Sequence, residues 1–192
     1  KRYGNSWQAG ETLSCAIGQS YVLMTPLQLA QSYAAIGNGG LIYRPRLVKE
    51  IFTIGGEVRS KSKPQLKKKL DLDPKNLALI KEGLFKVVNE PGGTAYRYRL
   101  PEGAMVGKTG TSQVIGFSSD KIYSRCEDRD YKYRHHGIFA ALAPYENPRI
   151  SVAVVVEHGC HGSSAAAPVA KKIIEKYLEK YAVSEPGNQN EI

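Results

Sequence analysis

The segment "EGAMVGKTGTSQV", residues 102–114, contains a Gly-Lys-Thr sequence that two unrelated kinds of site use. In a phosphate-binding loop, backbone N–H groups and the lysine surround the phosphates of a nucleotide. In a serine acyl-transfer site, an extended strand presents a lysine and hydroxyl groups to a peptide. The residues around Gly107 distinguish these two interpretations.

The residues before Gly107 do not fit a phosphate-binding loop. Such a loop places its first glycine five residues earlier, where this chain has Glu102, whose carboxylate would repel an anion. The preceding "AYRYRLPE" is polar and contains a proline, so it does not read as the buried strand that leads into such a loop. The following "TGTSQVIGF" is typical of a strand rather than of a helix. Nucleotide binding therefore stays an alternative and is disfavoured.

An extended strand through Lys108 suits acyl transfer. Lys108 and Gly110 then lie on one face, with Thr109 and Thr111 on the other face or at the rim. The missing side chain of Gly110 lets a substrate backbone lie close. Lys108 supplies positive potential for a carboxylate, the threonine hydroxyls donate to it, and a strand-edge N–H stabilises an oxyanion.

Composition indicates one globular domain or a large part of one. The chain has 192 residues, of which 42% are hydrophobic, and no apolar run is long enough to span a bilayer. It begins "KRYGNSWQAG" without an initiating methionine, and we expect it to be cut from a longer protein. The three cysteines are widely spaced and imply no disulfide framework; one bridge is possible, and unpaired thiols are the default expectation.

The net charge of +9 is concentrated in "RSKSKPQLKKK", residues 59–69. This stretch contains no aromatic residue for base stacking, so we expect a solvated connecting loop and no nucleic-acid partner. A basic module that binds anionic polymers is the other alternative for the whole chain.

Capping and periodicity predict an α+β fold, with an antiparallel sheet and packing helices. Thr25-Pro26 and Asp73-Pro74 are helix starts. The predicted helices are 26–38, 74–89 and 167–181, and the last carries a stripe formed by Val169, Ile173, Tyr177 and Tyr181. The predicted strands are a hairpin at 47–60 with a two-residue Gly55-Gly56 turn, 105–117, and two neighbouring antiparallel strands at 137–145 and 149–159, in a sheet covered on both faces. Residues 118–134 form a charged stretch that either lines the mouth of the site or is a solvated loop.

Four segments together resemble the class B penicillin-binding protein transpeptidases. They are "AIGQSYVLMTPLQLAQSYAAIGNGG", "NEPGGTAYRY", "VGKTGTSQV" and "FAALAPYENPRISVAVVVEHG", and they follow in the family's order over nearly the whole chain. The elongation-type members resemble it most and the division-type members second. The resemblance implies the C-terminal part of a penicillin-binding and serine β-lactamase-like transpeptidase domain. Residues 1–183 would form that part and 184–192 a flexible tail.

The family uses Ser-x-x-Lys, Ser-x-Asn and Lys-Thr-Gly, and only the last is credibly present here. "SKSK", Ser60 to Lys63, and "SSDK", Ser118 to Lys121, have the first spacing but lie in unsuitable positions, and Ser-x-Asn is absent. We therefore expect no nucleophile in this chain and no activity of the fragment alone.

By resemblance, Lys108 and the backbone N–H of Thr111 are catalytic, the latter as half of an oxyanion hole. Thr109, Gly110 and Thr111 bind the carboxylate end of a stem peptide or a β-lactam. The complete protein would be a serine-type D,D-transpeptidase that cross-links peptidoglycan, needs no cofactor and works with a cell-wall glycosyltransferase. It would be anchored at the periplasmic face of the bacterial inner membrane by a segment that is absent here.

Three further groups have simpler explanations. Gly18-Gln19 is expected to shape the turn before the helix at 26–38. His158, Cys160 and His161 are too closely spaced for a tetrahedral metal site, so no metal is expected. His135-His136 is expected at the entrance of a strand. Because upstream helices should cover one face of the sheet, we also expect exposed apolar area.

Overall fold

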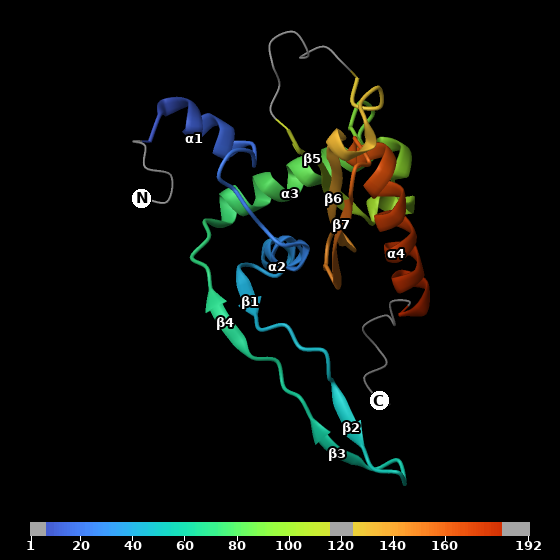
Figure 1. The fold of residues 1–192 in the computed structure, drawn as a ribbon. Coiled ribbons are helices and arrows are strands. Elements are labelled where there is room, and N and C mark those ends of the chain that lie inside the picture. The colour runs from blue at the N-terminus through green and yellow to red at the C-terminus, as the bar shows by residue number, and fades with distance from the viewer. Residues whose placement is uncertain (1–6, 116–124, 182–192) are drawn as a thin grey trace.

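The computed structural model describes residues 7–115 and 125–181, and its centre is a three-stranded antiparallel sheet (Figure 1). The strands are β5 (Val106–Ser112), β6 (His136–Ala143) and β7 (Ile150–Val156), in the order β5-β6-β7. Lys108 is opposite Ala140 and Gly110 is opposite Ile138. The predicted antiparallel strands are confirmed, although β5 is shorter than the predicted 105–117. Among the described residues, β5 pairs with β6 alone and is an edge strand.

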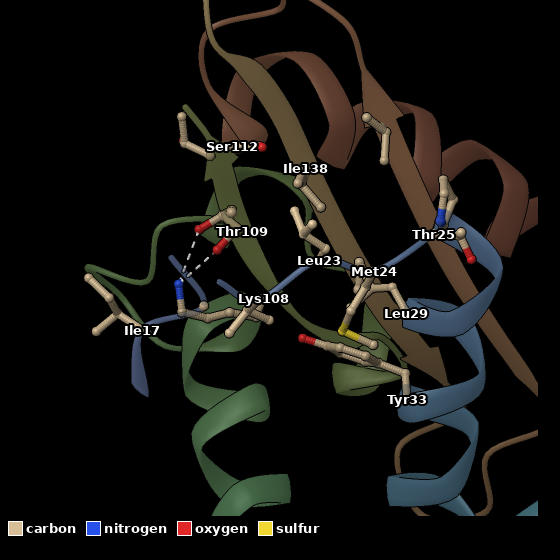
Figure 2. Close-up of a pocket in the computed structure, with 17 residues that line it drawn as sticks. Ile17, Leu23, Met24, Thr25, Leu29, Tyr33, Lys108, Thr109, Ser112 and Ile138 are labelled. Carbon is tan, nitrogen blue, oxygen red and sulfur yellow. Dashed lines mark hydrogen bonds between the residues drawn. The ribbon is translucent and has the colours of Figure 1, made fainter. Parts of the chain in front are cut away.

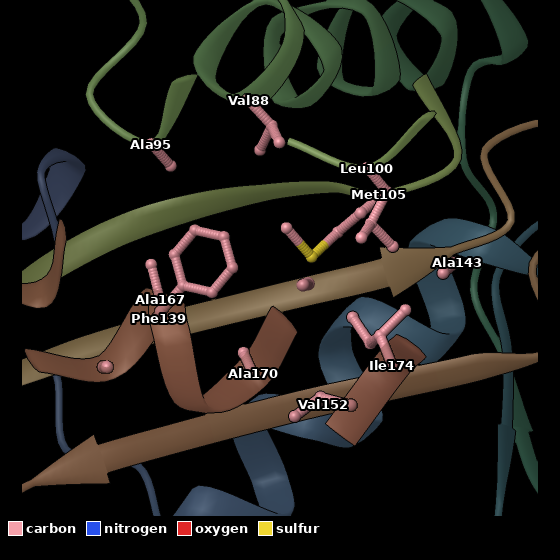
Figure 3. Packing of buried hydrophobic residues seen from close by; sticks show 12 residues of the cluster. Val88, Ala95, Leu100, Met105, Phe139, Ala143, Val152, Ala167, Ala170 and Ile174 are labelled. Carbon is pink, nitrogen blue, oxygen red and sulfur yellow. The ribbon is translucent and has the colours of Figure 1, made fainter. Parts of the chain in front are cut away.

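Helix α4 (Ala167–Lys180) packs on one face of this sheet (Figure 3). Its buried residues are Ala167, Ala170 and Ile174, which join Phe139 and Val152 of the sheet in the main core. The helix was predicted correctly, but the predicted stripe was wrong. Val169 and Ile173 are more than 40% exposed. Small alanines allow a close approach to the sheet, and such a face carries little hydrophobic signal in the sequence.

The other face of the sheet is approached by α2 (Pro26–Gly37), and α3 (Pro74–Asn89) contacts β5 (Figure 1). Thr25 caps α2 by accepting from the Gln28 N–H at 3.2 Å, and Asp73 caps α3 by accepting from the Lys75 N–H at 2.7 Å. Each cap is followed by proline at the first helical position, which has no N–H to leave unpaired. Both helices therefore begin where the sequence predicts.

An arm of two antiparallel ladders extends from the body between α2 and α3 (Figure 1). Its strands are β1 (Leu41–Tyr43), β2 (Glu50–Phe52), β3 (Val58–Lys61) and β4 (Leu66–Lys69), paired as β1 with β4 and β2 with β3. The predicted hairpin is present, but the Thr53 N–H bonds to the Glu57 carbonyl, so three residues and not two form the turn. The prediction of a loop at 59–69 was also wrong. Its basic residues are solvated, as expected, but they lie largely on β3 and β4.

The remaining elements are short, and several were not predicted. Helix α1 (Ala9–Ala16) precedes α2, and single helical turns lie at η1 (Tyr96–Tyr98), η2 (Pro101–Gly103), η4 (Tyr131–Tyr133) and the π-helix η5 (Gly162–Ala166). The expected tail at 184–192 and the first part of the charged stretch at 118–134 lie outside the described residues. No helix within 7–115 or 125–181 has the length and apolar character required to cross a bilayer.

Candidate active site

Strand β5 carries the Gly-Lys-Thr sequence in an extended conformation. Gly107, Lys108 and Thr109 are all in register with β6, and residues 113–115 do not begin a helix. A phosphate-binding loop would instead curl these amides around an anion and lead into a helix. The phosphate-loop alternative is therefore wrong.

Lys108 lies over the open edge of β5 (Figure 2). Its Nζ donates to the Thr109 carbonyl oxygen at 2.9 Å and lies 3.5 Å from the Thr109 hydroxyl. The side chain is exposed, and no ion pair involves it within the described part of the chain. The ammonium group therefore supplies positive charge to a strand edge whose backbone groups face outward.

Gln19 bonds to the same edge. Its Nε2 donates to the Thr111 carbonyl oxygen at 2.9 Å. Because the N–H and C=O of a strand residue point to the same side, this bond shows that the Thr111 N–H also faces away from β6. Gly18 has φ +78° and shapes the turn as predicted, but the contact of Gln19 with β5 was missed. The resemblance of this segment to the family was the available signal.

The back of β5 is packed tightly at Gly110. A Cβ on Gly162 would collide with the backbone of Gly110 and Ile138, so only glycine fits this turn of η5. A Cβ on Gly110 itself would meet Ile138 at 3.4 Å, which is ordinary van der Waals contact. The side of Gly110 that faces the site therefore has room that the protein's own atoms do not fill.

Two hydrogen bonds connect the end of α3 and the turn that follows it to β5 and the residue before it. The Asn89 side-chain N–H donates to the Met105 carbonyl at 2.9 Å, and the hydroxyls of Thr94 and Thr109 lie 2.8 Å apart. These bonds fix where β5 starts and where the Thr109 hydroxyl lies. The contact of Thr94 with β5 was missed, although Thr94 lies in the segment "NEPGGTAYRY" that resembles the family.

A pocket of about 380 Å³ opens along this edge (Figure 2). Residues Lys108 to Ser112 form one wall, and α2 with the loop before it forms the other. Tyr33 on α2 also lines it, and burial raises the pKa of Tyr33 to about 12. Ile17 and Leu23 line the pocket while more than 70% exposed, in agreement with the expected exposed apolar area.

Beyond the end of β5, a disulfide joins Cys126 to Cys160, with a Cα–Cα distance of 5.7 Å. The sequence left one bridge possible, whereas the default expectation of unpaired thiols was wrong for this pair. Cys15 is the free cysteine. No group of three or more metal-ligating side chains gathers in the regions that the structure describes.

His135 is buried beside this disulfide and contacts Val114 after β5 and the loop at 126–129. Its ring Nδ1 accepts a hydrogen bond from the Val114 N–H at 3.2 Å, and its ring Nε2 lies 2.9 Å from the Arg129 guanidinium. The backbone N–H of His135 donates to the Cys126 sulfur. Burial, followed by the positive charge of Arg129, lowers the pKa of His135. The lowered pKa favours the neutral imidazole, whose bond with the Val114 N–H connects a residue just after β5 to this region. His136 begins β6, so the expected strand entrance is confirmed.

The antiparallel sheet with packing helices and an open strand edge at a pocket is the class of fold that the sequence predicted, and comparison with known proteins identifies the family. The profile of the family described as "Penicillin binding protein transpeptidase domain" matches residues 2–175. The chain belongs to this family. The predicted resemblance is confirmed, and the similar proteins described below are of the penicillin-binding protein 2, or MrdA, type.

Two curated relatives show the level of similarity. The peptidoglycan D,D-transpeptidase MrdA of Haemophilus influenzae is 34% identical over 183 residues, which cover 94% of this chain and 28% of the relative. That of Escherichia coli is 30% identical over 179 residues, which cover 93% of this chain and 28% of the relative. The chain thus spans less than a third of the length of these relatives.

Solved structures support the same family assignment. Penicillin-binding protein 2 of Helicobacter pylori, in complex with MreC, has a TM-score of 0.71 at 28% identity, over 95% of this chain and 30% of that one. Penicillin-binding protein 2 of Pseudomonas aeruginosa, in complex with WCK 5153, has a TM-score of 0.67 at 36% identity, over 92% of this chain and 36% of that one.

Proposed function

We propose that this chain is part of a peptidoglycan D,D-transpeptidase and supplies the strand that binds the end of a stem peptide or of a β-lactam. The observation that carries the proposal is the open edge of β5, where Lys108 and the backbone groups of Thr111 face a pocket. The family membership supports it. The basic-module alternative is not supported, because the basic residues lie on the arm and not at this pocket.

The proposed reaction divides the work between β5 and a serine outside this chain. The serine oxygen attacks the carbonyl of the peptide bond between two D-alanines, the terminal D-alanine leaves with a proton, and a neighbouring amine then displaces the serine. The Thr111 N–H donates to the oxyanion that develops in each step. Such a donor lowers the activation free energy by about 3 kcal/mol. The positive charge of Lys108 stabilises the same region.

The carboxylate of the substrate occupies the hydroxyl-rich part of the edge. In this proposal the hydroxyls of Thr109 and Thr111 donate to it, while the absent side chain of Gly110 admits the peptide backbone. The ammonium group of Lys108 is the proposed ion-pair partner of this carboxylate, since Lys108 forms no ion pair with another described residue.

We place the nucleophile outside this chain. Ser60, the first residue of "SKSK", lies on the exposed arm strand β3, away from β5, and Ser118 lies outside the described residues. The exposed apolar residues Ile17, Leu23 and Met24 then form the surface on which the nucleophile-bearing segment packs. Residues 1–183 remain our proposed extent of the domain.

The cellular setting of the complete protein is also a proposal. The complete protein is proposed to act at the periplasmic face of the inner membrane, with a cell-wall glycosyltransferase as one partner. A protein of the MreC kind is another candidate partner, because such a protein is bound in the Helicobacter pylori structure.

Labelled penicillin tests this proposal. The complete protein that contains this chain should form a covalent adduct that survives denaturation, and unlabelled penicillin should compete for it. The 192-residue chain alone should gain no mass on incubation with the drug. Absence of an adduct on the complete protein, or an adduct on this chain alone, would contradict the proposal.

A further inference from the structure

Thr94 is held rigidly beside β5 although its side chain is exposed. The Ala95 N–H donates to the Val87 carbonyl at 3.0 Å, and Ala95 is fully buried. A side chain on Gly93 would collide with the same turn of α3. Both neighbours of Thr94 are therefore fixed, and its hydroxyl is presented to Thr109 at 2.8 Å.

The donors around the Thr109 hydroxyl decide what it offers to a ligand. A hydroxyl has one proton and two lone pairs, whereas an ammonium group has only protons to give. The Lys108 Nζ lies 3.5 Å from this oxygen, and the Thr94 hydroxyl is the second group that can donate to it. When both donate, the lone pairs of Thr109 are used and its proton is left to point outward.

We propose that Thr94 is a positioning residue, which donates its proton to Thr109 and so commits the Thr109 hydroxyl to donate to the carboxylate of the substrate. An ionised carboxylate only accepts hydrogen bonds, so the two groups are matched. Without Thr94, the Thr109 hydroxyl is free to rotate, and part of its population presents a lone pair to an anion. This inference rests on the proposed function of β5.

The test compares Thr94→Val, which keeps the shape and removes the hydroxyl, with Thr94→Ser, which keeps the hydroxyl. In the complete protein, Thr94→Val should lower the second-order rate of acylation by penicillin about tenfold, the effect expected of one hydrogen bond to a charged group. Thr94→Ser should stay within about twofold of wild type. With Thr109→Val as background, Thr94→Val should cause no further loss, because the two hydroxyls act as one unit.

A neutral methyl ester of the same penicillin separates positioning from general damage. The ester lacks the anionic acceptor, so Thr94→Val should hardly change its rate of acylation. Equal losses for acid and ester, or a Thr94→Val rate equal to wild type with the acid, would overturn the role of Thr94 while leaving the proposed function intact. If the wild-type protein is not acylated at all, the proposed function fails and this inference fails with it.

Discussion

Gly162 packs against the backbone of Gly110 on β5, and the two positions are glycine for different reasons. The backbone of β5 and β6 leaves no room for a side chain on Gly162, whereas the protein's own atoms leave room on Gly110. A Gly110→Ala substitution should therefore keep the melting temperature within a few degrees, since alanine in a strand costs no conformational entropy relative to glycine.

In the complete protein, the same Gly110→Ala change should lower the rate of acylation by penicillin tenfold or more, because a methyl group displaces the ligand backbone and small displacements from the reactive position are costly. The matched control is Gly162→Ala, which should lower the melting temperature by several degrees. Thermal unfolding and acylation kinetics measured on both variants check this. Unimpaired acylation of Gly110→Ala would show that no ligand lies against this residue.

We expect His135 to make the stability of the fold depend on pH. Its lowered pKa means that the unfolded chain binds a proton more readily than the folded one just below pH 6.5, the ordinary pKa of histidine. Its contribution to stability is therefore complete above that pH and declines as the pH falls toward the lowered folded pKa. Asparagine offers an oxygen in place of Nδ1 to the Val114 N–H and does not titrate.

We accordingly expect His135→Asn to lose less stability than wild type between pH 7 and pH 5. Thermal melts across this range measure the difference between the two curves, which cancels the titration of other groups. Parallel curves would mean that His135 does not titrate differently in the folded and unfolded states.

At the level of single residues, the sequence predicted the residues at the edge of β5 but not the residues that contact them. Lys108 to Thr111 carry a recognisable motif. Gln19 and Thr94 reach β5 from positions 92 and 15 residues away, and a contact of this kind depends on the fold rather than on local pattern. The pairing of Cys126 with Cys160 was not predicted for the same reason, because cysteine spacing alone does not specify which thiols meet.

Among the elements, α4 shows most clearly what packing adds to pattern. Its large residues suggested one face, and its alanines occupy another that lies against the sheet. We expect Ile174→Ala to destabilise the protein by about 2–5 kcal/mol, because a fully buried side chain leaves a cavity. Ile173→Ala, one position earlier and exposed, should cost less than about 1 kcal/mol. Denaturant unfolding of the two variants gives both values, and similar losses would place the buried face where the sequence pattern had suggested.

The disulfide between Cys126 and Cys160 closes a loop of 34 residues. Replacing both cysteines by serine should lower the free energy of unfolding by about 3–4 kcal/mol, on the chain-entropy estimate for a loop of this length. Cys15→Ser, which breaks no bridge, is the control and should be nearly neutral. Equal stability of the double variant and the control in denaturant titrations would show that the bridge does not support the fold.

Element boundaries were predicted well where capping chemistry is local. Thr25-Pro26 and Asp73-Pro74 set the starts of α2 and α3 through single hydrogen bonds. The β1–β4 ladder was missed, because its two strands are separated by the whole β2–β3 hairpin and β4 reads as a run of lysines. Non-local pairing of this kind leaves no periodic signal.

For the whole molecule, the sheet with α4 on one face and α2 approaching the other is a frame that presents one strand edge to a pocket (Figure 1). The order of elements along the chain predicted an antiparallel sheet covered on both faces, but not which helix covers which face. Ile17 and Leu23 are exposed at the pocket within this frame, and in our proposal they form part of the surface on which the nucleophile-bearing segment packs.

The central claim is that the edge of β5 receives the carboxylate end of the ligand. A crystal structure of the complete protein acylated by penicillin tests it most directly. We predict the drug's carboxylate within hydrogen-bond distance of the Thr109 and Thr111 hydroxyls, and the acyl oxygen at the Thr111 N–H. A drug bound covalently with its carboxylate away from this edge would contradict the account.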